Sequence, residues 1–180
     1  DDGLRLNIHS ILECHPALQV RLLREGLRLL RGDLKSIETS HLNAVLELMH
    51  GERSQAELDL PGCWVARRYD QLWLCEIPPQ IEGFDLLLEI GEPLSLPDGR
   101  ILQAELQEYP DETGRNLAVF DMSVLHFPLR VRNHLPGDRF RPSGMKGQRK
   151  IKDFLIDLKL EKECRLSLPL LLNQDEILWL

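Results

Sequence analysis

The stretch that decides the fold class is residues 56–77, with the sequence AELDLPGCWVARRYDQLWLCEI. Apolar residues recur there at about every second position, which is the period of a strand with one buried face. A Pro-Gly turn at residues 61–62 and an Asp-Gln connection at residues 70–71 divide the stretch into three parts. The pattern therefore predicts a meander of three short strands at residues 56–60, 63–69 and 72–77.

Upstream of the meander, residues 4–51 follow a helical period. Apolar residues recur at steps of three and four over residues 4–12, 18–30 and 42–49, and Pro16 breaks the first run. Gly32 and Gly51 are suited to end the second and third helices, and Thr39 or Ser40 is expected to cap the third. Amphipathic helices must bury their apolar faces, so residues 1–77 are predicted to form a helical substrate-binding region, a bundle that ends in the meander.

Downstream, Pro78-Pro79-Gln80 interrupts the strand pattern and is the strongest candidate for an internal boundary. Residues 78–127 are predicted to form a connecting β segment, with strands at 84–90, 100–109 and 117–120. Residues 128–180 are predicted to hold a helix at 151–160 and a closing hairpin of residues 168–172 and 177–180. The fold class is thus α+β, a helical bundle region with a small β-meander followed by a mixed α/β C-terminal domain.

The charge distribution points to an anionic partner. Residues 130–152 contain eight Lys or Arg and one acidic residue, whereas the rest of the chain contains 14 basic and 28 acidic residues. A basic stripe on an acidic body attracts nucleic acid at that stripe and repels it elsewhere. The alternative is a solvated, charged loop rim, which is the commoner role of a charge run.

The candidate binding residues all lie in this segment. They are Arg130, Arg132, Arg139, Arg141, Lys146, Arg149, Lys150 and Lys152. Arg predominates, and its planar fork suits phosphate oxygens. Three glycines, Gly137, Gly144 and Gly147, would let the backbone turn tightly and approach a ligand.

Two further features of this region bear on the site. Lys150 and Lys152 fall at the first turn of the predicted helix, where the helix dipole disfavours positive charge, so a phosphate site is expected there. Asp121 stands alone in a predicted apolar strand. It would either orient Arg130 or Arg132 or serve as an edge-strand or turn residue, and the sequence does not separate the two.

A second group of arginines lies on the predicted upstream helix, and Arg21, Arg24, Arg28 and Arg31 repeat along one side of it. A solvated face is the favoured interpretation, with contact to an RNA backbone as the alternative.

Catalytic motifs are missing from the sequence. It contains no phosphate-binding G-x-x-x-x-G-K-[ST] or G-x-G-x-x-G, no H-E-x-x-H and no G-x-S-x-G. The six histidines and four cysteines are scattered without metal-ligand spacing, so no metal is expected and the cysteines are interpreted as reduced thiols of a cytoplasmic protein. No apolar run approaches the roughly 20 residues that span a bilayer, so no membrane partner is expected. The chain is predicted to be a binding unit.

From residue 121 to residue 179 the sequence resembles the C-terminal region of bacterial tRNA(Ile)-lysidine synthetase. The matching residues keep their order: Asp121, Pro128-Leu-Arg-Val-Arg132, Gly137-Asp-Arg-Phe140, Pro142, Gly144-Met-Lys-Gly147, Arg149-Lys-Ile-Lys-Asp153, Arg165, Pro169-Leu-Leu171 and Ile177-Leu-Trp179. Upstream, residues 16–24 and 37–50 are similar to the helical middle region of that family. Together the resemblance covers most of the chain.

The resemblance implies an ATP-dependent ligase that attaches lysine to C2 of the wobble cytidine of a minor isoleucine tRNA. In that family, ATP with magnesium and lysine bind an N-terminal domain with an S-G-G-x-D-S phosphate loop, which this sequence lacks. The chain is therefore expected to be the tRNA-binding part of such an enzyme, without a cofactor of its own. Because it starts without Met and ends on an apolar run, it is also expected to be a fragment, truncated at its C-terminal end.

Carried over by position, the basic residues would contact the tRNA backbone, the three glycines would shape the loop, and Asp138 and Asp153 would orient the basic side chains. The chief rival is a stand-alone module that binds an acidic protein surface or another anion without a catalytic role. Whether the protein forms a homodimer is left open.

Overall fold

The computed structural model describes residues 3–108, 114, 116–142, 144 and 147–180. The chain divides into two compact units, Asp1–Gln80 and Ile81–Leu180, and each is described by itself. The division coincides with the predicted interruption at Pro78-Pro79-Gln80.

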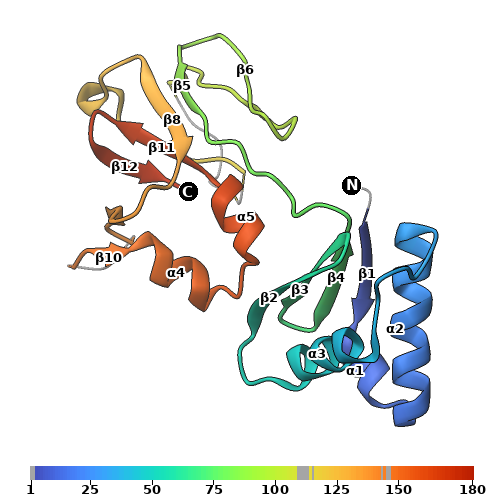
Figure 1. Ribbon diagram of the computed structural model, residues 1–180. Coiled ribbons are helices and arrows are strands. Elements are labelled where there is room, and N and C mark those ends of the chain that lie inside the picture. The colour runs from blue at the N-terminus through green and yellow to red at the C-terminus, as the bar shows by residue number, and fades with distance from the viewer. Residues whose placement is uncertain (1–2, 109–113, 115, 143, 145–146) are drawn as a thin grey trace. The chain divides into compact units, whose positions relative to one another are not determined.

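The first unit is built on a four-stranded antiparallel sheet (Figure 1). Its strands are β1 (Gly3–Asn7), β2 (Gln55–Leu60), β3 (Cys63–Arg68) and β4 (Gln71–Cys75), in the order β1-β4-β3-β2. The predicted three-strand meander is confirmed as β2, β3 and β4. The helix expected from residue 4 was wrong at its start, because residues 3–7 form β1. Leu4 and Leu6 alternate with polar residues, as a half-buried strand requires.

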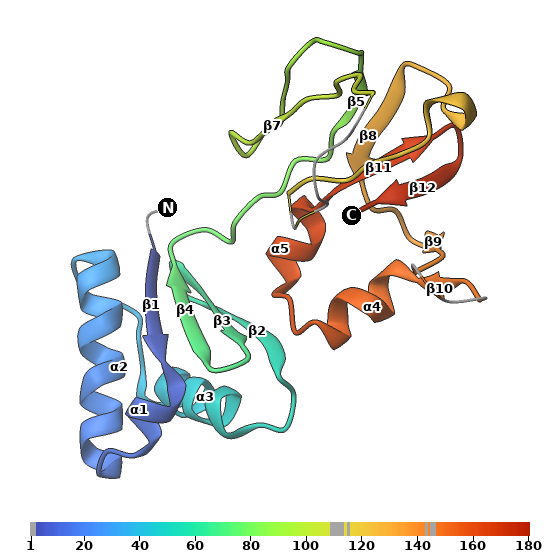
Figure 2. The same ribbon diagram turned by 180° about the vertical axis from the view of Figure 1, so that it is seen from behind.

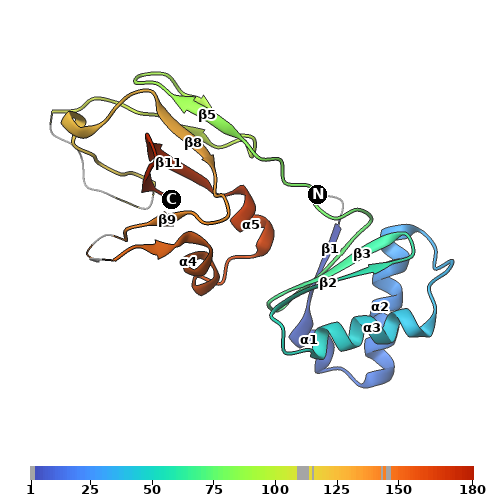
Figure 3. The same cartoon turned by 60° about the vertical axis from the view of Figure 1, so that its left-hand side comes forward.

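Three helices, α1 (Ile8–Leu12), α2 (Pro16–Arg31) and α3 (Thr39–His50), cover one face of this sheet (Figure 3). Leu23, Leu27 and Leu42 belong to the same buried cluster as Leu72 and Leu74 of β4. Since the apolar faces of the helices are buried against the sheet, the expected helical bundle is not confirmed.

The predicted helix ends are largely confirmed. Gly32 caps α2 in the left-handed region, with φ of 79°, and Gly51 is the C-cap of α3. The expected cap of α3 at Thr39 or Ser40 was wrong. Glu38 occupies that position, and its backbone N–H donates to Nδ1 of His41 at 3.0 Å.

The second unit holds another antiparallel sheet, in the order β12-β11-β8-β5. Its strands are β5 (Asp85–Leu88), β8 (Leu129–Asn133), β11 (Pro169–Asn173) and β12 (Glu176–Trp179). Two-residue strands form two smaller pairs, β6 (Leu94–Ser95) with β7 (Ile101–Leu102) and β9 (Arg139–Phe140) with β10 (Arg149–Lys150). The helices are η1 (Met122–Val124), α4 (Ile151–Asp157) and α5 (Lys162–Ser167) (Figure 2).

Each face of this second sheet carries a buried apolar cluster. On one face, Leu88, Leu129 and Val131 belong to a cluster with Leu171, and on the other, Leu170 packs with Ile151 and Leu155 of α4 and with Leu172. The helix α4 is thereby fixed against the sheet through two fully buried residues. That packing also sets the position of the β9–β10 pair, which leads directly into α4.

The closing hairpin is confirmed as β11 and β12, and the predicted helix is confirmed as α4, although it ends at Asp157. The strand expected at residues 84–90 is β5. Of the strand expected at 100–109, residues 101–102 form β7, and Tyr109 lies outside the described residues. At 117–120 the structure has an isolated bridge between Gly114 and Leu117. Since β5 pairs with β8, the predicted connecting segment shares a sheet with residues 128–180.

Candidate nucleic-acid interface

The β9–β10 pair displays basic side chains on one side and packs against α4 with its other side. The antiparallel register sets Lys150 opposite Arg139 and Arg149 opposite Phe140. Cross-strand partners share a face of the pair, and neighbours along a strand point to opposite faces. Phe140 contacts the ring of Phe154 in α4, with centroids 5.0 Å apart. The Phe140 side is therefore the packed one, and the other side carries Arg139 and Lys150.

Arg149 belongs to the packed side. Its guanidinium lies 5.5 Å from the ring of Phe154, and it forms an ion pair with Asp157 at the end of α4. The side chain is 35% exposed. Arg149 thus ties the pair to the helix, and its charge is already matched.

Arg139, Arg141, Lys150 and Lys152 differ from Arg149 in being exposed. Within the described part of the chain, none of the four forms an ion pair. Because the strands are antiparallel, Arg141 lies beyond one end of the Arg139–Lys150 pair and Lys152 beyond the other. We call these four residues the basic ribbon.

The like charges of the basic ribbon do not stabilise the fold. Two cations directly opposite each other on neighbouring strands destabilise the pairing. Such a local conflict is a sign of function, because an anion bound across the pair would remove the repulsion. Guanidinium and ammonium groups at exposed positions are the chemistry that contacts phosphate oxygens.

Arg132 occupies a different environment from the basic ribbon. Its side chain is 10% exposed, and Nη1 and Nη2 donate to the Asp138 carboxylate at 2.7 and 3.0 Å. Nη1 also donates to the carbonyl oxygen of Asn133 at 2.8 Å. The predicted phosphate contact by Arg132 does not fit this geometry, because the group is enclosed and its charge is matched.

Asp138 organises the turn that leads into β9. It accepts a third hydrogen bond from the backbone N–H of Leu135 at 2.6 Å, and its own carbonyl accepts from the N–H of Ile151 at 3.1 Å. Burial raises the pKa of the Asp138 carboxyl, but the hydrogen bonds from Arg132 and Leu135 outweigh it and leave the pKa below its usual value. The expected orienting role of Asp138 thus acts on Arg132 and on the start of α4.

The hydrogen bond from Ile151 to Asp138 changes the prediction of a phosphate site at the start of the helix. The N–H of Ile151, the first residue of α4, is already bonded to Asp138. The expected phosphate site of free N–H groups is therefore partly occupied by the chain itself. Lys150 is the N-cap residue and Lys152 lies in the first turn, so both act as exposed cations of the basic ribbon.

Arg130 lies on β8 and not in a loop. Its Nε donates to Asp85 of β5 at 2.7 Å, and a second hydrogen bond completes the fork. The hydrogen bond from Arg130 lowers the pKa of Asp85. Both side chains are about half exposed, so the pair joins neighbouring strands at the surface, next to solvent.

Asp121 contacts neither arginine that the sequence suggested. Its carboxylate accepts from the N–H of Ser123 at 2.9 Å and caps η1, which confirms the turn alternative. Asp153 is exposed in the first turn of α4, and its carbonyl oxygen accepts from Arg149 at 3.4 Å. Lys146 lies outside the described residues.

Two of the three glycines of residues 130–152 are explained by the backbone conformation that the turns require. Gly137 and Gly144 have φ of 96° and 80°, in the left-handed region where other residues are strained. A Cβ at either position, or at Gly147, would meet nothing within 4 Å. Close approach of a neighbour therefore does not explain them, whereas the turn geometry explains the first two.

Asn133 is a positioning residue that the sequence did not reveal. It is buried, its Oδ1 accepts from the N–H of Phe84 at 2.6 Å, and its Nδ2 donates to the carbonyl of Leu166 at 2.7 Å. One side chain thus ties β8 to the entry of β5 and to α5. A polar residue at the end of an apolar strand was the available signal.

Half of the arginine stripe of α2 is engaged within the first unit. Arg28 donates to Glu25 at 2.9 and 2.6 Å, and Arg31, 15% exposed, donates to the carbonyl of Lys35 at 3.2 Å. Arg21 and Arg24 are exposed. Two members of the four thus have local partners, as a structural helix face would.

The described residues contain no group of three His, Cys, Asp or Glu side chains placed to hold a metal ion. Of the helices in the described ranges, none is both long and apolar enough to cross a membrane.

Comparisons with known proteins match both units. A family model described as the TilS substrate binding domain matches residues 6–73, and one described as the TilS substrate C-terminal domain matches residues 129–180. The tRNA(Ile)-lysidine synthase of Geobacter sulfurreducens is 34% identical over 169 residues, 90% of this chain and 36% of that protein. The tRNA(Ile)-lysidine synthase of Dehalococcoides mccartyi is 33% identical over 194 residues, 100% of this chain and 40% of that protein.

A solved structure titled "Crystal structure of TILS C-terminal domain" is similar with a TM-score of 0.50 and 31% identity. The similarity covers 54% of this chain and 78% of that one. The chain spans 36% and 40% of the two curated relatives, well under half of their length.

Proposed function

Because the chain belongs to the tRNA(Ile)-lysidine synthase family, we propose that it is the part of such a ligase that holds the tRNA. The whole protein would attach lysine to the wobble cytidine of a minor isoleucine tRNA. This sequence has no Ser-Gly-Gly phosphate loop that would bind ATP, so no chemical step is assigned to its residues. A homodimeric state and a cytoplasmic location remain predictions.

The observation that carries the proposal is the basic ribbon. Lys150 and Arg139 face each other across β9 and β10, exposed and without acidic partners in the described ranges, on a protein with a net charge of −7. The repulsion between them is relieved by a polyanion that lies across both strands. Folded RNA is gripped mainly through its backbone and shape, because side chains do not reach the base edges in the deep groove of an RNA duplex.

The geometry supports separate roles for the seven basic residues of the segment that the structure describes. The basic ribbon would contact phosphates, Arg132 would position the turn, and Arg130 and Arg149 would tie neighbouring elements together through Asp85 and Asp157. Lys146 is retained as a predicted contact from the sequence.

A pair of matched double variants tests the proposal. In Arg139→Ala/Lys150→Ala, two phosphate contacts are lost, so tRNA affinity should fall and the slope of log K against log salt should become shallower by about two. The control Lys35→Ala/Arg53→Ala removes the same charge from exposed positions of the first unit. Equal affinity loss in both double variants would assign the effect to net charge and contradict the site.

The same titrations with heparin address the rival function. A module for acidic surfaces in general would bind heparin and tRNA with the same affinity and the same dependence on Arg139 and Lys150. The proposed function predicts tighter binding to tRNA, since shape contributes beside charge.

A further inference from the structure

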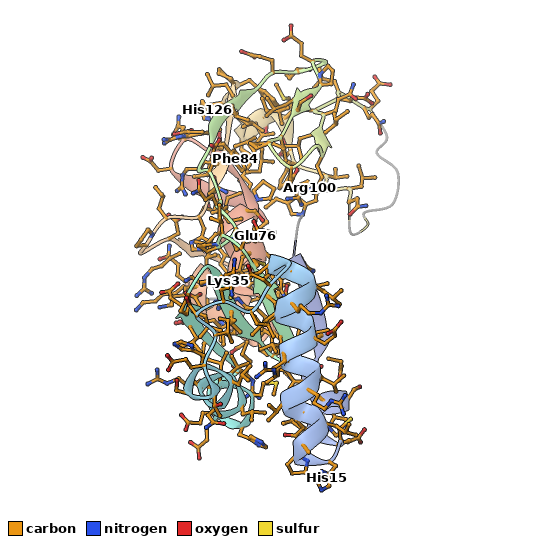
Figure 4. The ribbon with its side chains drawn as sticks, turned by 45° about the vertical axis from the view of Figure 1, so that its right-hand side comes forward. His15, Lys35, Glu76, Phe84, Arg100 and His126 are labelled. Carbon is orange, nitrogen blue, oxygen red and sulfur yellow. The ribbon has the colours of Figure 1, made fainter. Side chains whose placement is uncertain are left out.

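The first unit contains a pocket of about 610 Å³ where β4 leaves the sheet. Gly3, Arg5 and Trp73 contribute lining from β1 and β4, and Glu76, Ile77 and Pro79 from the chain that follows. Figure 4 labels Glu76, which lies toward the end of α2 opposite to His15. The volume falls within the range of small-ligand sites, roughly 300–1,000 Å³. None of these residues belongs to the basic ribbon.

A stacked arginine belongs to this lining. The register of β1 and β4 sets Arg5 directly opposite Trp73, and the Arg5 guanidinium carbon lies 4.1 Å from the indole ring centre. The cation–π contact holds one plane of the guanidinium against Trp73. The second plane faces away from the indole, and Arg5 is exposed. A guanidinium plane held in this way is a surface on which a base stacks.

Two other residues of the lining, Trp73 and Glu76, also bear polar groups. The indole Nε1 of Trp73 is buried and has no hydrogen-bond partner among the residues that the structure describes. Buried indole N–H groups usually have an acceptor, so a ligand acceptor that reached this N–H would satisfy it. Glu76 supplies a carboxylate that accepts hydrogen bonds but repels phosphate.

These features together select a ligand with a flat π face, an acceptor and an N–H donor. A nucleobase has all three, whereas a phosphate would meet the carboxylate of Glu76. A base within a duplex keeps its faces stacked on its neighbours, so the base must be unpaired.

We infer that this pocket binds an unpaired nucleobase of the bound RNA, stacked on the outer plane of Arg5. The inference rests on the proposed function and extends it, because it gives the first unit a contact with a base while the basic ribbon contacts phosphates. A free nucleotide carries the same base, so the experiment must separate the two sources.

The test uses Arg5→Lys, which keeps the charge and removes the plane. An unmodified transcript of the minor isoleucine tRNA is the probe, and both its affinity and the reactivity of each base toward dimethyl sulfate and carbodiimide are measured. Stacking of one base is worth about 1–3 kcal/mol, so affinity should fall between about fivefold and 150-fold. One unpaired nucleotide should be protected by the unaltered protein and reactive with the variant. Arg21→Lys makes the same change at an exposed position of α2 and should alter neither readout.

The salt slope distinguishes this inference from the proposed function. It should be the same for Arg5→Lys as for the unaltered protein, since no charge is lost. If Arg5→Lys binds tRNA within twofold of the unaltered protein and protects the same bases, the pocket inference is wrong and the proposed function stands. If the unaltered protein shows no salt-dependent tRNA binding, both fail. If CMP or AMP bound in a way that depends on Arg5 while no tRNA base was protected, the inference that the base belongs to RNA would be wrong. The pocket would then be assigned to a free nucleotide.

Discussion

Replacing Asp138 with Asn tests how the basic ribbon is held in place. The Asp138 carboxylate accepts hydrogen bonds from Nη1 and Nη2 of Arg132 and from the N–H of Leu135, at 2.7, 3.0 and 2.6 Å. The side chains of Asp138 and Arg132 are 14% and 10% exposed. The Asn side chain has nearly the same shape but carries no charge, so Arg132 would remain enclosed with an unmatched charge.

The expected cost follows from that burial. Removing one partner of a buried ion pair costs about 3–5 kcal/mol, because the remaining charge keeps its desolvation penalty. The pair retains some solvent contact, so we take the lower end, about 3 kcal/mol. For a unit the size of Ile81–Leu180, each kcal/mol lowers Tm by roughly 4–8 °C, which gives a loss of roughly 12–24 °C.

Hydrogen exchange measured by mass spectrometry follows the two units separately. Amides of β8, β9 and β10 should lose protection in Asp138→Asn, while those of β2, β3 and β4 should not change. Asp85→Asn is the matched control, because it breaks the exposed ion pair of Arg130, which lies on the same strand as Arg132, and should cost no more than about 1 kcal/mol. Replacing both partners with apolar residues, as Arg132→Met/Asp138→Leu, should restore much of the lost stability. If Asp138→Asn and Asp85→Asn had equal effects, the anchoring role of the Arg132–Asp138 pair would be refuted.

Three further predictions concern stability. Gly137→Ala places a Cβ on a residue with φ of 96° and should cost about 1–2 kcal/mol, measured by urea unfolding, whereas an unchanged midpoint would show that the turn relaxes at no cost. Arg67→Ala removes hydrogen bonds to the carbonyls of Leu48 and Met49 at the end of α3, at 3.3 and 2.8 Å, so it should lower hydrogen-exchange protection in the first unit by about 1–3 kcal/mol and leave the second unit unchanged. The pKa of Asp138 is lowered in the folded state, so the stability that its carboxylate contributes is present above about pH 4 and is lost as the pH falls through the folded-state pKa. The free energy of unfolding, measured from pH 6 downward, should therefore decline less in Asp138→Asn than in the unaltered protein. If the two proteins lost stability in parallel as the pH fell, the lowered pKa would be contradicted.

The parts of the fold that the sequence predicted are those with local signals. The meander and the closing hairpin each combine a period of two with a turn, so neighbouring residues contain the information. The strand β1 was missed because its five residues run directly into α1 and its partner β4 lies more than sixty positions away. Its alternating Leu4 and Leu6 are the signal that could have found it.

The candidate site was predicted in composition but not in geometry. The charge of residues 130–152 marked the segment, yet Arg130 and Arg132 belong to β8, where Leu129 and Val131 alternate with them. The acidic partner Asp85 comes from a strand 45 positions away, which no local pattern reveals. Asp121 was suggested instead, because it is closer in sequence. Separating exposed cations from buried or paired ones therefore required the three-dimensional structure.

The salt dependence of tRNA binding by this 180-residue chain tests the central claim most directly. If the four cations of the basic ribbon each replace a counterion, log K should fall with log salt with a slope of about −3 to −4. Affinity would then drop by about 10² between 50 and 200 mM salt. A flat dependence, or the same slope in Arg139→Ala/Lys150→Ala as in the unaltered chain, would contradict the account.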